Sequence, residues 1–70
     1  MQKEWMINCF SYVHGKKNAF DLAKVLNKLK SNSSKLFSVW LISPGIYCVM
    51  GEVTRRDWIF LDLSSDFMEI

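Results

Sequence analysis

Residues 36–51, LFSVWLISPGIYCVMG, decide the fold predicted for this chain. Two apolar runs flank Pro44-Gly45. Proline fixes the φ angle that the second position of a turn needs, and glycine accepts the positive φ of a type II turn. The sequence therefore predicts an antiparallel hairpin whose strands are Leu36 to Ile42 and Ile46 to Met50.

Further strands are predicted on both sides of this hairpin. Trp5 to Val13 is rich in bulky and aromatic residues and is followed by His14-Gly15, which is typical of a strand that ends in a turn. Trp58 to Leu63, which follows a connection of residues 51–57, is also predicted as a strand, because its successive side chains alternate between two largely apolar faces. With one helix between the first two strands, the order is β-α-β-β-β. The 70 residues are expected to form a single α+β domain, a mostly antiparallel sheet with one helix packed on one face.

The helix is predicted from the apolar spacing that follows residue 18. Asn18 can cap its first turn, and Asp21 lies where a carboxylate meets the free amides and the positive end of the helix. At about 100° per residue one apolar stripe forms, with Val25 at its edge. The stripe consists of Ala19, Leu22, Ala23, Leu26 and Leu29. The polar run at residues 31–34 is expected to end the helix.

The predicted strands carry more apolar residues than one helix can cover. The helix is expected to pack on Phe37, Val39, Leu41, Ile59, Leu61 and Leu63. The opposite face then holds Trp40, Tyr47, Val49, Trp58 and Phe60, where an antiparallel sheet normally presents polar groups to water. Three occupants are considered for that face: the apolar C-terminal tail at residues 67–70, a protein partner or second copy, and nucleic-acid bases.

Charge is distributed unevenly although the net charge is only +2. Residues 16–35 contain six lysines and one aspartate, whereas residues 57–70 contain four acidic residues and no basic one. The helix face formed by Lys17, Lys24 and Lys28, with Phe20 beside it, could grip phosphates and stack a base. Nucleic-acid binding through these four residues is the alternative hypothesis, although a solvated helix face has the same pattern.

The leading hypothesis is a small non-enzymatic module that binds a protein. Trp40, Tyr47, Trp58 and Phe60 are its candidate anchors, since aromatic residues dominate protein interfaces. The predicted hairpin tip at Arg55 and Arg56 would supply a charged rim. Size and composition suggest an inhibitor, an antitoxin-like protein or a phage-type modulator of a host protein, located in the cytoplasm. So short a chain has a small core, and association either with a protein partner or with itself, as a homodimer, is the reinforcement expected.

Catalysis and metal binding have little support in the sequence. His14, with Tyr12, Lys16 and Lys17, could supply the acid and base of a small metal-independent ribonuclease, which is a third hypothesis. Cys9 and Cys48 lie in apolar runs and are predicted to be buried free thiols. No Cys-x-x-Cys pair and no glycine-rich loop is present, so no metal and no cofactor is predicted.

Overall fold

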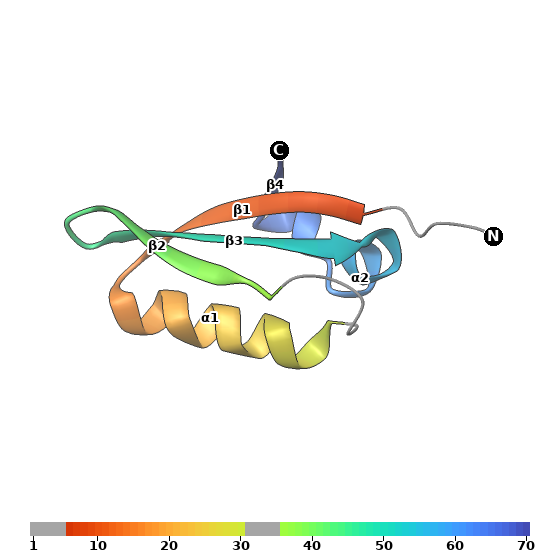
Figure 1. Ribbon diagram of the computed structural model, residues 1–70, viewed down its shortest axis with the longest axis horizontal. Helices are drawn as coiled ribbons and strands as arrows, with labels where there is room; N and C mark the ends of the chain where they lie inside the picture. Colours follow the sequence, from red (N-terminus) through yellow and green to blue (C-terminus); the bar gives the residue numbers. More distant parts are fainter. Residues whose placement is uncertain (1–5, 31–35) are drawn as a thin grey trace.

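A computed structural model describes residues 6–30 and 36–70 of the chain. Its elements are β1 (Met6–His14), α1 (Lys16–Leu29), β2 (Ser38–Ser43), β3 (Ile46–Thr54), α2 (Arg55–Phe60), the 3-10 helix η1 (Leu63–Ser65) and β4 (Met68–Glu69). The strands form one antiparallel sheet in the order β2-β3-β1-β4, with α1 along one side of it (Figure 1). The predicted α+β class is confirmed. Trp5 and the polar run at residues 31–34 lie outside the described residues.

The predicted hairpin and helix both form, although β3 continues four residues beyond its predicted end at Met50. Pro44 and Gly45 make the turn between β2 and β3, and Gly45 has the positive φ of 79° that the turn requires. The N-cap lies three residues before the predicted one: it is Gly15, and the Asn18 side chain donates a hydrogen bond back to the carbonyl of His14 at 3.0 Å. Asn18 therefore ties the first turn of α1 to the end of β1 instead of capping it.

One face of the sheet, which we call the covered face, carries the hydrophobic core. Ile7 and Cys9 of β1 lie opposite Val53 and Gly51 of β3, and all but the glycine are completely or almost completely buried. From α1, the residues packed on them are Ala19, Ala23 and Leu26. The predicted stripe is thus confirmed at its centre, while Val25 and Leu29 at its margin remain about half exposed.

The predicted last strand, Trp58 to Leu63, is wrong. Thr54 ends β3, and its hydroxyl accepts a hydrogen bond at 3.1 Å from the amide of Asp57, which caps a short helix, α2. A threonine followed three residues later by an acidic residue is a helix-start signal, and here it overrides the alternating apolar pattern. Trp58 and Leu61 pack against the core on the covered side, whereas Ile59 is exposed.

The predicted register of β3 is wrong by one residue. Val49 pairs with Ser11 and Val39, and Tyr47 pairs with Val13 and Leu41. These pairs place Tyr47 and Val49 on the covered face, and Val49 is completely buried. An irregularity between Leu41 and Ser43 adds one residue to β2 beside the turn, so counting alternation across the turn assigns β3 to the wrong face.

The C-terminal tail does not cover the opposite face. Phe67 packs into the core, with its ring 5.7 Å from that of Phe37 in an edge-to-face contact. Met68 and Glu69 then pair with Phe10 and Cys9 as the edge strand β4. The tail therefore widens the sheet, and it leaves the face opposite to α1 uncovered by any described residue.

Candidate functional site

The uncovered side of the sheet, which we call the open face, carries large apolar side chains from all four strands. Its members are Phe10 and Tyr12 of β1, Trp40 of β2, Met50 of β3, Met68 of β4 and Ile70 after it. Trp40 is 59% exposed and Ile70 is 73% exposed. An antiparallel sheet with one solvated face normally alternates apolar and polar residues. The open face departs from that pattern on every strand.

These side chains lie in rows across the strands. Met68, Phe10, Met50 and Ser38 form one row, and Tyr12, Cys48 and Trp40 form the next. Phe10 and Tyr12 contact each other edge to face, with ring centroids 5.4 Å apart. Because neighbouring strands hold these groups about 5 Å apart, the open face is a continuous apolar surface and not a set of isolated residues.

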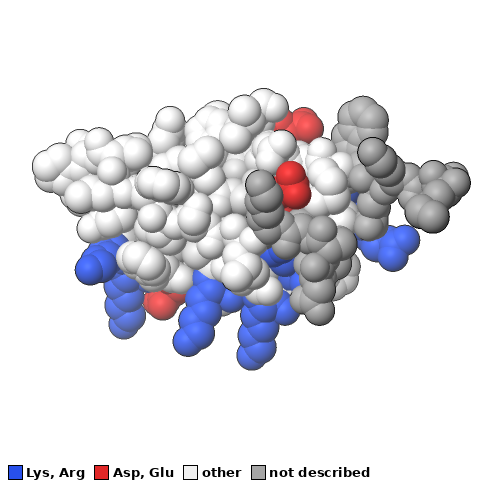
Figure 2. All heavy atoms as spheres, in the orientation of Figure 1, with Lys and Arg blue, Asp and Glu red and all other residues white. Residues whose placement is uncertain are grey.

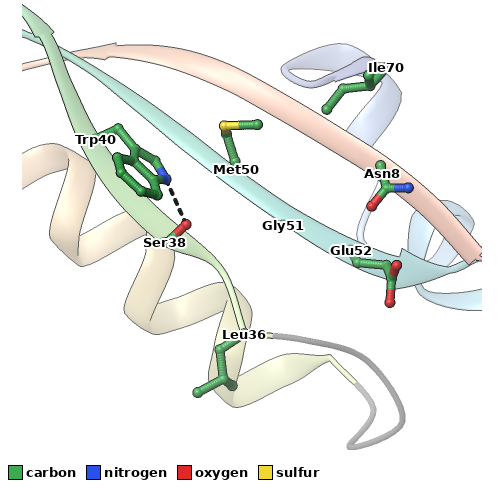
Figure 3. A pocket seen from close by; sticks show the side chains of 8 residues that line it. All are labelled: Asn8, Leu36, Ser38, Trp40, Met50, Gly51, Glu52 and Ile70. Carbon is green, nitrogen blue, oxygen red and sulfur yellow. Dashed lines mark hydrogen bonds between the residues drawn. The ribbon is translucent and has the colours of Figure 1, made fainter.

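A shallow cleft of about 270 Å³ lies on the open face. Its walls include Trp40, Met50 and Ile70, and its far end is polar, formed by Asn8 and Glu52 (Figure 3). The indole N–H of Trp40 donates a hydrogen bond to the Ser38 hydroxyl at 2.9 Å. That bond directs the indole along β2, with the ring beside the cleft. The cleft can therefore receive an apolar group beside a polar or basic one.

The lysines of α1 are separated from this surface. Figure 2 shows basic side chains along the edge of the molecule where α1 runs, while the surface over the β2–β3 hairpin carries none in that view. Lys17, Lys24 and Lys28 are all exposed on α1, pointing away from the sheet that Ala19, Ala23 and Leu26 contact. The lysines and the open face thus occupy different sides of the protein.

Both cysteines lie in surroundings that disfavour the thiolate. Both are free and buried, as predicted. Burial, with a smaller contribution from the charge of Glu69, raises the pKa of the Cys9 thiol to about 11. Burial also raises the pKa of Cys48, which lies on the open face between Tyr12 and Trp40. Because the thiolate is the nucleophile and metal ligand, these thiols behave as small apolar groups.

The structure brings only part of the predicted anchor set to one surface. Trp40 lies on the open face as predicted. Tyr47 and Trp58 pack against the core on the other side, so their predicted place beside Trp40 is wrong. Phe60 is 75% exposed, but it lies at the end of α2 and not on the sheet. Arg55 and Arg56 are exposed in the first turn of α2, not at a hairpin tip.

The residues of the other two hypotheses are exposed. Phe20 is half exposed on α1, the helix that also carries Lys17, Lys24 and Lys28. His14 ends β1, and Tyr12 shares its side of that strand.

Within residues 6–30 and 36–70, no group of three or more histidine, cysteine or acidic side chains could hold a metal ion.

Sequence reasoning missed five members of the open face: Phe10, Tyr12, Met50, Met68 and Ile70. The alternation in β1 does place Phe10 and Tyr12 together, which was the available signal. Met50 was lost through the one-residue slip in β3. For Met68 and Ile70 no local signal exists, since a two-residue edge strand is defined only by its partner.

Comparisons with known proteins supply no relatives for this fold and surface: no family matches the chain, and neither do curated proteins or solved structures. In the described part of the chain, none of the helices has the length and apolar character needed to cross a bilayer.

Proposed function

We propose that this protein is a non-enzymatic interaction module that binds a larger protein through its open face and thereby modulates it. The observation that carries the proposal is the apolar surface shared by all four strands, with Trp40 held by Ser38 at its cleft. Large contiguous apolar patches on the surface of soluble domains mark interaction sites or ligand-binding grooves. Aromatic residues and methionine are also the types enriched in protein interfaces.

The size of the cleft favours a side chain of a partner over a cofactor. Small-molecule sites usually enclose roughly 300–1,000 Å³ and surround their ligand. This cleft, at about 270 Å³, is smaller and lies open on a sheet face. It fits one or two apolar side chains, with a basic group of the partner facing Glu52. A partner surface that projects an apolar side chain beside a lysine or arginine has the required chemistry.

Charge favours a protein over a nucleic acid at this site. Binding to a nucleic acid needs lysines or arginines beside the stacking aromatic groups. The charged residue in the cleft lining is the acidic Glu52. The lysines of α1 lie on another side of the molecule, with Phe20 as their aromatic neighbour. The protein would modulate its partner by occupying part of the partner's surface, as an inhibitor or antitoxin-like protein does.

Site-specific photo-cross-linking in the native cell tests this proposal. A benzophenone amino acid is placed at Met50, on the open face, and in a matched protein at Phe60, which is exposed on α2. We expect a discrete protein adduct from position 50 that position 60 does not give. Equal adduct patterns from both positions, a nucleic-acid adduct from position 50, or no adduct from position 50 would each contradict the proposal.

A further inference from the structure

We propose that β2 is a dimerisation edge, at which a second copy of this chain adds its own β2 in antiparallel orientation to make one eight-stranded sheet. This inference concerns the edge of the sheet and does not rest on the proposed binding at the open face, and Trp40 is the residue that the edge and the open face share. Strand β2 is the outer strand of the sheet on one side, opposite to the short strand β4 (Figure 1). Its six residues contain no charge and no proline, two of the devices that block strand addition at an edge.

Hydrogen bonds elsewhere in the sheet fix which residues of β2 face outward. The amide of Ile70 donates to the carbonyl of Asn8 at 2.8 Å, so Asn8 directs its backbone toward β4. Because backbone direction alternates along each strand, the neighbours Ile7 and Cys9 must bond to β3. The register then directs Met50 and Cys48 of β3 toward β2, where their partners are Ser38 and Trp40.

Val39 and Leu41 are therefore the residues whose N–H and C=O groups point away from the sheet. The same alternation is visible at Phe37, two residues before Val39. The side-chain amide of Asn27 on α1 bonds to both backbone groups of Phe37, accepting at 2.6 Å and donating at 3.2 Å. Asn27 thus takes the place of a neighbouring strand at this first outward position. The next two outward positions are left for another strand.

Two copies fit this edge in one symmetric register. If Trp40 lies opposite Trp40 of the partner subunit, Val39 of each copy faces Leu41 of the other. These two pairs form the hydrogen-bonded pairs of an antiparallel ladder, and the Trp40 pair lies between them, where side chains approach most closely. The indoles then contact each other on the open face. With a two-fold axis at Trp40, every open backbone group of Val39 and Leu41 acquires a partner.

The helix layer supports a second copy in the same position. The amide of Gly15, which precedes α1, bonds to the carbonyl of Gly45 at the hairpin turn, and Asn27 bonds to Phe37. Helix α1 therefore runs antiparallel to β2. Seven residues of helix and three of strand both span about 10 Å, which brings Phe20 level with Trp40. Phe20 is half exposed and Leu41 is 65% exposed, so a second copy would bury both beneath the joined strands.

This arrangement also predicts the direction of a salt effect. Lys16 and Lys24 lie one turn on either side of Phe20, and the two-fold axis brings Lys16 of one copy toward Lys24 of the other. Salt screens such repulsion, so we expect the dimer to be stabilised by added salt. Nucleic-acid binding through the same helix would be weakened by salt, which separates the two.

Sedimentation of three proteins tests the edge. The natural chain is expected to reach twice its 8.2 kDa mass as its concentration rises. Leu41→Pro removes an outward N–H without removing a bond to β3. We expect this substitution to raise the dissociation constant of the dimer at least tenfold. Leu41→Ala keeps the N–H and is the matched control, expected to dimerise more tightly than Leu41→Pro. A natural chain that stays monomeric at millimolar concentration overturns the proposal.

Amide exchange on the natural chain gives a second measurement that does not depend on a variant folding. The amides of Val39 and Leu41 are expected to exchange several-fold more slowly at high protein concentration. The Trp40 amide, bonded to β3 in each copy, is expected to change little. The proposal is overturned if the exchange rates of the Val39 and Leu41 amides do not change with protein concentration. A folded Leu41→Pro protein that dimerises as tightly as the natural chain also overturns it.

Discussion

A Val49→Asp protein is expected to be unfolded at room temperature, whereas Met50→Asp, one residue further along β3, is expected to fold. Val49 is completely buried between α1 and the sheet, while Met50 lies at the open face, 37% exposed. An unpaired carboxylate on the covered face costs several kcal/mol, which is comparable to the whole stability of about 5–15 kcal/mol that small domains have. Far-ultraviolet circular dichroism and urea unfolding measure both proteins.

This pair of substitutions also decides the register of β3. Alternation counted across the Pro44-Gly45 turn assigns Val49 to the open face and Met50 to the covered one, because the extra residue of β2 is not visible in the sequence. In that register the outcomes exchange: Val49→Asp folds and Met50→Asp does not. An Ile59→Asp protein is a suitable control, since Ile59 is 67% exposed on α2. It should unfold at nearly the same urea concentration as the natural chain.

Gly51→Ala is expected to destabilise the protein by about 2–3 kcal/mol, the upper range for overpacking a core. A methyl group added at Gly51 would come within 2.5 Å of the Phe37 ring, well inside contact distance. The ring cannot move away freely, because it also packs on Phe67 and the backbone of Phe37 is held by both bonds to Asn27. Urea unfolding of the variant measures the loss.

A double-mutant cycle with Phe37→Ala identifies the cause. Alanine lacks the Cγ and the ring carbons that approach position 51, so in this background Gly51→Ala should cost at least 1 kcal/mol less than alone. If the cost is unchanged, the glycine is required for another reason, such as backbone conformation. A Gly45→Ala protein provides a contrast: no atom lies within 4 Å of the added methyl group there, and its cost would come from the positive φ alone.

How much of this molecule could be predicted from sequence depended on whether the signal was local. The Pro44-Gly45 turn and the 3.6-residue spacing of Ala19, Ala23 and Leu26 are local, and both predictions are confirmed. The segment after Thr54 failed because its apolar alternation competes with a helix cap, and the cap prevails. A two-residue strand such as β4 exists only through its pairing with Phe10 and Cys9, so no pattern within it could reveal it.

The candidate site follows the same rule. The sequence identifies an apolar excess on the sheet and places Trp40 on the face opposite to the helix, where the structure has it. Its other aromatic members could not be assigned, since membership depends on the register of β3 and on the destination of the C-terminal tail. Phe67 enters the core while Met68, one residue later, joins the open face. Neighbouring apolar residues thus have opposite roles, and only long-range pairing distinguishes them.

The central claim is that the open face is the binding surface. Its most direct test is to measure the affinity of the cross-linked partner for the Met50→Asp protein. Both proteins in this comparison, Met50→Asp and the control Phe60→Asp, change a side chain outside the core. We predict that Met50→Asp weakens binding at least 30-fold, the equivalent of about 2 kcal/mol for an interface hot spot, and that Phe60→Asp changes it less than threefold. A folded Met50→Asp protein that binds the partner as tightly as the natural chain would contradict the claim.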